Sequence, residues 1–299
     1  MAVLNTYDTT AGNREDIYDV LQLVSPEETP LFTRLPDAVA NATQHQWVEY
    51  TLSSGSGNQA LEGATATGAT SSSKARVSNY CQINQQNGSV SGTQRRVTIV
   101  GEQDEFAFQM KKSMLQWKIE VENDLILSTA TSGDDTHARK MDGLQTSLNA
   151  YSNGVTGSAS TIALRESDFN LALQNIFSSG AVADTCYVNG FNKRRISQFA
   201  TSNVRFLDVD STGLIRNRVS AYDSDFGTIE IILERYVPAN NGILLKDSLF
   251  RKAWLRKPVT YPLAKRGDLD EFQIVGELTL EHLNNRAGAV LSAFASATS

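Results

Sequence analysis

Residues 102–130 constrain the fold of this chain most, because they read as one long α-helix. Large apolar side chains recur every three or four residues and so share one stripe: Phe106, Met110, Met114, Trp117, Val121 and Leu125. A second stripe widens the apolar surface: Ala107, Leu115, Ile119 and Ile126. About 25 residues at 1.5 Å each form a rod of roughly 40 Å. The sequence therefore predicts a spine helix that other elements cover on more than one side.

The acidic side chains near the C-terminal end of this helix indicate a basic partner. Acidic side chains suit the positive N-terminal end of a helix dipole, but Glu120, Glu122 and Asp124 lie towards the opposite end. Residues 251–266 contain no acidic side chain and six basic ones: Arg251, Lys252, Arg256, Lys257, Lys265 and Arg266. We therefore expect part of this basic run to face the acids of the helix, within one subunit or between two.

The first 45 residues do not form a core of their own. A small, polar stretch is followed by an amphipathic helix that Asn13 caps and then, after Pro26, by a short turn from Pro30. Such short pieces are unstable alone. Their apolar anchors must therefore rest on another element, in the same subunit or its neighbour: Ile17, Leu21, Leu31, Phe32 and Leu35.

Residues 53–74 are almost wholly small and polar, and Leu61 is their one large apolar side chain. Strand-like segments flank them, from Gln46 to Leu52 with Trp47, and from Arg76 to Ile83. The pattern predicts a long extended hairpin whose tip is ordered by another chain.

The remaining segments indicate a compact α/β lobe followed by a group of strands. We expect a helix over 167–178, a buried strand over 185–188 and a helix over 193–199 that Asn192 caps. We also expect a hairpin that pairs 227–237 with 243–245. The final strands are predicted over 253–259, 272–275 and 276–283, before an alanine-rich tail.

The composition narrows the function. A net charge of −6 argues against a protein that mainly grips nucleic acid. Two cysteines, far apart, are interpreted as isolated reduced thiols, and no apolar run or N-terminal pattern predicts a membrane span or a secretory signal. His45, His137 and His282 lack metal-ligand spacing, and 71–74 (SSSK) lacks the companion motifs of a serine nucleophile. We predict no catalytic residue, metal or cofactor.

Several short motifs follow one another in a recognisable order: 15–17 (EDI), 25–32 (SPEETPLF), 225–229 (DFGTI), 235–238 (RYVP), 261–268 (YPLAKRGD) and 276–281 (GELTLE). With the plan of arm, extended loop, spine helix, lobe and strands, they resemble the major capsid proteins of tailed bacteriophages with the Hong Kong 97 (HK97) fold. The segment at 25–32 is similar to the SPxxTPF opening of one podophage-type branch.

This resemblance implies an α+β, HK97-like fold with four parts. Residues 1–45 would be an N-terminal arm and 46–100 an extended E-loop, both lying on neighbouring subunits. Residues 101–139 and 250–299 would form a peripheral P-domain, and 140–249 an axial A-domain. The residues predicted to contact other subunits are Ile17, Leu21, Leu31, Phe32, Trp47, Leu61, Glu120, Glu122, Arg251 and Arg256.

The implied function is a major capsid protein. Its subunits would assemble as hexamers and pentamers, in the host cytoplasm, into an icosahedral or prolate shell. The shell would enclose double-stranded DNA without sequence-specific binding and would work with a portal protein and, where used, scaffolding or decoration proteins. We expect neither covalent cross-linking nor a bulky pro-domain. Two alternatives stay open: a tail-tube or decoration protein, which the long helix disfavours, and a hydrolase with an unrecognised site.

Overall fold

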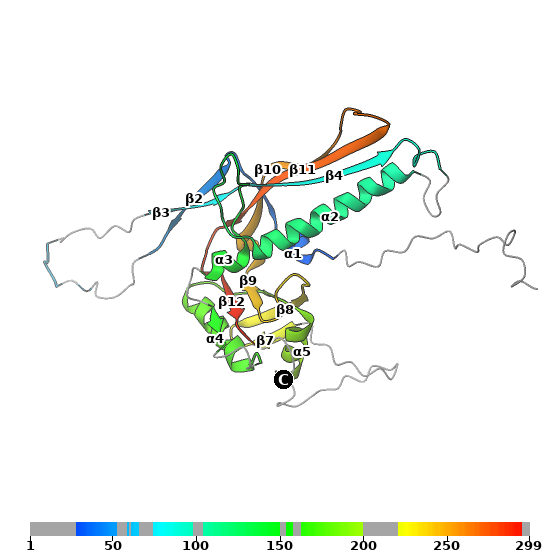
Figure 1. Cartoon of the computed structure of the whole chain (residues 1–299). Helices are drawn as coiled ribbons and strands as arrows, with labels where there is room; N and C mark the ends of the chain where they lie inside the picture. Colours follow the sequence, from blue (N-terminus) through cyan, green and yellow to red (C-terminus); the bar gives the residue numbers. More distant parts are fainter. Residues whose placement is uncertain are drawn as a thin grey trace, which may run out of the picture.

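The computed structural model describes residues 28–52, 59, 61–65, 74–97, 104–149, 154–157, 163–199 and 221–294. They form two lobes and a projecting hairpin (Figure 1). One lobe joins a long helix to a four-stranded sheet, and the other surrounds a six-stranded sheet with helices. The architecture is α+β, as predicted.

The spine lobe is organised by α2 (Glu105–Leu127), which confirms the predicted long helix. The helix begins where the Asp104 side chain accepts a hydrogen bond from the N–H of Phe106 at 3.0 Å. The sheet beside it has the order β1-β10-β11-β4. Its strands are β1 (Asp37–Val39), β10 (Phe250–Pro262), β11 (Leu269–His282) and β4 (Gln82–Ser91).

The strand β4 was not predicted, because its sequence QINQQNGSVS is polar on both faces. Its even-numbered side chains point towards α2 and bind that helix. The amides of Gln82 and Asn84 each donate to Asp124 at 2.7 Å, and the carbonyl of Asn84 accepts from the indole N–H of Trp117 at 2.9 Å. Polar residues therefore form the helix-facing side of this strand, since the helix supplies the acids that they bind.

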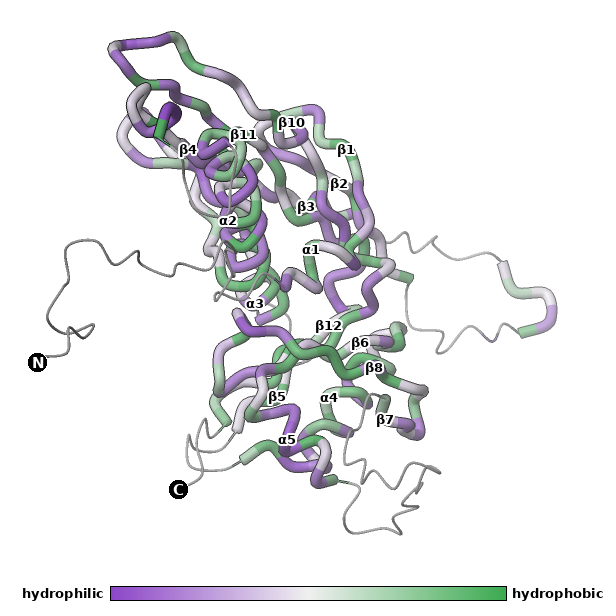
Figure 2. The backbone as a smooth tube through the Cα atoms, turned by 90° about the vertical axis from the view of Figure 1, so that its right-hand side faces the viewer, coloured by the Kyte–Doolittle hydropathy of each residue, from purple (hydrophilic) through white to green (hydrophobic). Residues whose placement is uncertain are grey.

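The second lobe, in the lower part of Figures 1 and 2, contains a sheet. Its strand order is β5-β12-β9-β6-β8-β7. These strands are β5 (Val155–Thr156), β12 (Gly288–Ser292), β9 (Gly242–Leu245), β6 (Thr185–Val188), β8 (Gly227–Leu233) and β7 (Ala221–Ser224). The predicted hairpin between 227–237 and 243–245 is wrong, because the fully buried β6 lies between β8 and β9 and pairs with both. The true hairpin partner of β8 is β7.

Helices cover this second sheet: α3 (Leu144–Asn149), α4 (Glu166–Ser178) and α5 (Gly190–Phe199). The predicted α4 is confirmed, but the cap of α5 is corrected. The side chain of Asn189, not that of Asn192, accepts from a helix N–H, and Asn192 is buried and donates to the carbonyl of Asn241 at 2.8 Å. Among the described helices, none is long and apolar enough to cross a membrane.

The C-terminal part of the chain is divided between the lobes. The strands predicted over 272–275 and 276–283 form one continuous strand, β11, whereas β12 arises from the predicted alanine-rich tail and enters the second sheet. One hydrophobic core runs through both lobes and includes Trp117 of α2, Phe169 of α4 and Leu291 of β12. The two lobes are therefore packed against each other through a continuous hydrophobic core.

Candidate functional site

The short helix α1 (Pro30–Arg34) lies where the two lobes meet, and it carries the first described residues of the predicted arm. Leu31 and Leu35 are buried in the shared core, as predicted for these anchors. After the helix, β1 pairs in parallel with β10 of the same chain. The expectation that residues 1–45 lie wholly on neighbours is thus corrected for 28–39, because hydrogen bonds and core packing fix them to their own subunit.

Glu122 of α2 holds the start of α1. Its two carboxyl oxygens accept hydrogen bonds from the backbone N–H groups of Leu31 at 2.8 Å and Phe32 at 2.6 Å. The side chain is fully buried and lies beside the carboxyl of Glu234, which follows β8 in the second lobe. Burial and the neighbouring carboxyl raise the pKa of Glu122 to about 9, and burial also raises the pKa of Glu234.

An aromatic cluster surrounds the next residue of α1. The ring of Phe32 stands edge-on to Trp117 and Trp254, with ring centroids 6.4 and 6.1 Å apart. The ammonium of Lys252 lies 4.2 Å from the centroid of the Phe32 ring and donates to the Phe32 carbonyl. Lys252 also pairs with Asp37 at 3.2 Å. Lys252 therefore stabilises the described start of the N-terminal arm and does not pair with the acidic residues of α2.

Arg34 fastens the end of α1 to the second lobe. Its guanidinium binds Glu230 of β8 at 2.7 Å and Asp247 at 3.0 Å, just after β9. Asp247 also accepts hydrogen bonds from the hydroxyls of Thr185 at 2.5 Å and Tyr187 at 3.1 Å. The helix α1 is therefore attached to the spine lobe by its backbone and to the second lobe by its last side chain.

The projecting hairpin consists of β2 (Gln44–Tyr50) and β3 (Lys74–Tyr80), which form a two-stranded sheet of their own. At its root, Trp47 packs edge-on against His282 with centroids 4.8 Å apart, and its indole N–H donates to Glu49 at 3.2 Å. Asn285 also donates to Glu49, at 3.0 Å. Burial lowers the pKa of His282 to about 4, so this imidazole is neutral at physiological pH.

Beyond the root, the hairpin exposes large apolar side chains. Tyr50, Leu52 and Leu61 have 71%, 85% and 86% of their surface exposed. A groove of about 620 Å³ lies beside Tyr50 and Leu52, bordered by residues 179–180 and 283–286 of the second lobe. Exposed apolar groups on a two-stranded sheet indicate a surface that a further chain covers.

The structure places the predicted contact residues in different settings. Leu31 and Glu122 are buried within the subunit and bind each other, and Phe32 and Trp47 pack on their own chain. Leu61 is exposed. Ile17 and Leu21 lie outside the described residues, as do most residues of 53–74.

The predicted attraction between helix acids and the basic run is not what holds this subunit. Glu120 binds the amide of Gln86, and Glu122 binds the backbone of α1. Arg256 pairs instead with Glu277 at 2.5 Å, and Arg251 lies on β10 opposite Glu281 of β11. A contact of these groups between subunits stays a prediction.

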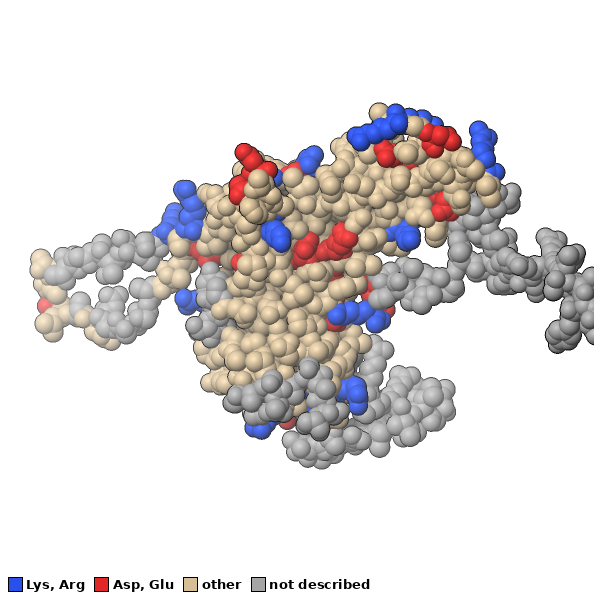
Figure 3. All heavy atoms as spheres, viewed as in Figure 1, with Lys and Arg blue, Asp and Glu red and all other residues tan. Residues whose placement is uncertain are grey.

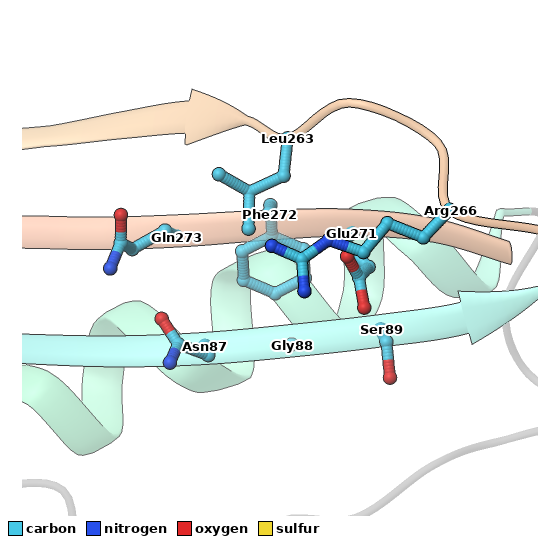
Figure 4. A pocket seen from close by; sticks show the side chains of 8 residues that line it. All are labelled: Asn87, Gly88, Ser89, Leu263, Arg266, Glu271, Phe272 and Gln273. Carbon is cyan, nitrogen blue, oxygen red and sulfur yellow. The ribbon is translucent and has the colours of Figure 1, made fainter.

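A second concave region lies at the far end of the spine lobe, with a volume of about 470 Å³ (Figure 4). Leu263 and Arg266 reach over β11 there, while Asn87 and Ser89 extend from β4. Within the described part of the chain, no three His, Cys, Asp or Glu side chains form a group able to hold a metal ion. On the face seen in Figure 3, acidic and basic side chains are interspersed along the spine lobe and the junction.

A long helix along a sheet, a second lobe around a mixed sheet and a projecting hairpin together define the HK97 fold, a fold of shell-forming proteins. Solved structures support this fold. The capsid asymmetric unit of cyanophage A-1(L) matches with a TM-score of 0.72 at 13% identity, over 98% of this chain and 100% of that one. The capsid of a native GTA particle matches with a TM-score of 0.69 at 13% identity, over the same shares of the two chains.

The family follows from the sequence comparison. The model of the family described as SU10 major capsid protein matches residues 4–295, and the chain belongs to this family of phage major capsid proteins. The chain is also similar to the major capsid protein of Escherichia phage Phieco32, with 23% identity over 96% of this chain and 95% of the relative.

Sequence reasoning did not find Glu234, Asp247 or Arg34 as members of this site. One signal was present for Glu234: it follows GTIEIIL, a strand whose alternate residues are buried, and an acid next to such a strand needs a partner. The partner lies in another lobe, more than 100 positions earlier, and no local pattern points to it.

Proposed function

We propose that copies of this chain assemble as hexamers and pentamers into the icosahedral or prolate head shell that encloses a phage genome. The observation that carries the proposal is the β2–β3 hairpin, a two-stranded sheet that leaves the body of the subunit with exposed apolar side chains (Figure 1). A pair of strands is marginally stable in water unless a third surface covers it. The hairpin gains that surface from the adjacent copy.

The parts of the subunit take the following roles. We assign the predicted contact with neighbouring copies to the part of the arm before residue 28, because residues 28–39 are fixed to their own subunit. We restrict the E-loop, predicted over 46–100, to β2, β3 and the residues between them, and we assign β4 to the P-domain with α2, β10 and β11, because β4 pairs with β11. The A-domain comprises residues from about 140 to 249 together with β12, and it lies at the centre of each capsomer.

The shell encloses double-stranded DNA without reading its sequence. Support comes from the net charge of −6 and from the mixed charges of Figure 3, since gripping phosphates requires clustered Lys and Arg. A portal protein, and scaffolding or decoration proteins where the phage has them, are the other partners. Assembly takes place in the host cytoplasm, and the role of the chain is structural and not catalytic.

The test is electron microscopy of the full chain after expression, together with a variant of the hairpin. The unmodified chain is expected to give closed shells. The double variant Leu52→Asp, Leu61→Asp places two charges on the exposed hairpin surface, and we expect subunits with unchanged circular dichroism that do not form shells. Glu62→Gln, beside Leu61 in the same loop, is the matched control and is expected to assemble.

Two outcomes would contradict the proposal. If the unmodified chain gave discrete monomers at every concentration, shell formation would be lost. If the double variant assembled as readily as the control, contact between subunits would not use the hairpin.

A further inference from the structure

Two buried carboxyl groups meet at the junction of the lobes. Glu122 comes from α2 and Glu234 from the segment after β8, and their side chains have 0% and 1% of their surface exposed. Glu122 uses both oxygens to accept the N–H groups at the start of α1. One oxygen of Glu234, Oε1, accepts from the N–H of Tyr236 at 3.1 Å. The other, Oε2, is buried without a donor in the described part of the protein.

A shared proton completes this arrangement. Two carboxylates that are buried side by side cannot both be charged at a tolerable cost, so one of them retains a proton. That proton gives Oε2 of Glu234 its hydrogen bond and bridges the two side chains. The backbone N–H groups of α1 then stabilise the single remaining negative charge.

None of the charged groups near Glu122 and Glu234 neutralises this pair in place of the shared proton. The charge of Arg235 acts on Glu234, but its guanidinium pairs with Glu28 at 3.0 Å. Burial raises the pKa of Tyr236, and both carboxyls raise it further. Lys252 of β10 binds Phe32 and Asp37, and Glu120 of α2 binds Gln86. Among the described residues, Arg235 is therefore the one cation whose charge acts on the pair.

We propose that Glu122 and Glu234 form a proton-held clasp that fixes the root of the N-terminal arm between the two lobes, and that loss of the proton releases α1. The clasp joins three elements that are distant in the sequence: α1, α2 and the end of β8. The inference concerns the subunit itself and does not depend on how subunits assemble.

The direction of the pH effect follows from linkage. An ordinary Glu loses its proton near pH 4.5, whereas burial beside a second carboxyl keeps the proton on this pair up to about pH 9. The native state therefore binds more protons than the unfolded chain across this window. The contribution of the clasp is complete below pH 4.5 and is lost as the pH rises through about 9.

Release of α1 would change two observable properties. The ring of Phe32 would leave the indoles of Trp117 and Trp254, whose fluorescence would shift to longer wavelength. Arg34 would lose its ion pairs with Glu230 and Asp247, and trypsin would cleave the peptide bond after Arg34. Both signals report on the same helix.

The experiment measures tryptic cleavage after Arg34 in the full chain by mass spectrometry, at pH values from 7.5 to 10. Cleavage after Arg266, in an exposed turn, corrects for the pH dependence of the protease itself. The corrected rate in the unmodified chain is expected to rise by up to about tenfold for each pH unit until about pH 9 and to level off above it, because opening releases a proton only while the closed pair still holds one. Tryptophan emission should shift over the same range.

The variant Glu234→Gln distinguishes loss of the clasp from a general destabilisation of the protein at alkaline pH. A glutamine at this position donates its N–H to Glu122 without a titrating proton, so the corrected rate should stay low and flat up to pH 10. Glu122→Gln should also give a flat profile but at a higher rate, because its single amide oxygen can accept only one of the two N–H groups at the start of α1. Glu120→Gln carries the same substitution two residues earlier on α2 and should behave as the unmodified chain.

The proposal is overturned if Glu234→Gln and Glu122→Gln retain the alkaline rise of the unmodified chain. It is equally overturned if the unmodified chain shows no rise, because the clasp then does not depend on a proton. A flat profile that appears in both glutamine variants but not in Glu120→Gln supports it.

Discussion

Gly88 on β4 gives a sharp test of how the spine lobe packs, since an alanine there would overfill a contact with Phe272. An ideal Cβ on Gly88 would lie 2.5 Å from Cε1 of the Phe272 ring, against 3.4–4 Å for an ordinary contact. The ring spans the gap between β11 and β4 (Figure 4), is fully buried and stands edge-on to Phe106 with centroids 5.3 Å apart. It must therefore shift by about 1 Å into occupied space, which costs about 1–3 kcal/mol.

Part of that cost is offset because alanine is about 0.5–1 kcal/mol more favourable than glycine inside a strand. The net expectation for Gly88→Ala is a loss of about 1–2 kcal/mol, which corresponds to a fall of a few degrees in melting temperature. The assay is thermal unfolding of the purified chain followed by fluorescence. Gly267→Ala is the control, because a Cβ at that exposed position meets nothing within 4 Å.

A double-mutant cycle decides whether the ring is the cause. In a chain that already carries Phe272→Leu, the smaller side chain leaves room, and Gly88→Ala should cost almost nothing. The coupling between the two sites is then about 1–2 kcal/mol. An equal loss in both backgrounds would refute the packing argument and point to the backbone of β4.

Two further predictions concern polar groups that are at least partly buried. Asp247→Ala removes the acceptor of a guanidinium and two hydroxyls, and it should lower the free energy of unfolding by about 1.5–3 kcal/mol, measured by denaturant titration; a loss below 1 kcal/mol would mean that water replaces the carboxylate. His282, whose pKa burial lowers from 6.5 to about 4, contributes stability that is complete above pH 6.5 and is lost as the pH falls through about 4. The fluorescence of Trp47, which packs on this imidazole, should change over that acidic range in the unmodified chain but not in His282→Asn.

The sequence was most informative where a local pattern decides the structure. The apolar stripe of 102–130 predicted α2 to within three residues at each end, and the prediction for α4 was equally close. The buried strand β6 was also predicted correctly from its four residues TCYV. In each case, the side chains that determine the element lie within it, so periodicity and propensity are sufficient.

Pairing between distant segments was the part that the sequence did not reveal. β4 was missed because its amides are satisfied by acids on α2, and the β8–β9 hairpin was wrong because β6, some 40 residues earlier, lies between the two strands. A basic partner was predicted for the acids of the helix. Within the described subunit their partners are instead amides and backbone N–H groups, which carry no charge signal in a sequence.

The entry of β12 into the second sheet has a consequence for how this protein is made. β12 pairs with β9 on one side and β5 on the other, so residues 288–292 complete a sheet whose other strands have left the ribosome long before. Until then, β9 has one unpaired edge and Leu244 and Leu245 lack their cover. A chain that ends before residue 288 therefore lacks one strand of the second sheet. Truncated messenger RNAs should yield few subunits that can assemble with their neighbours.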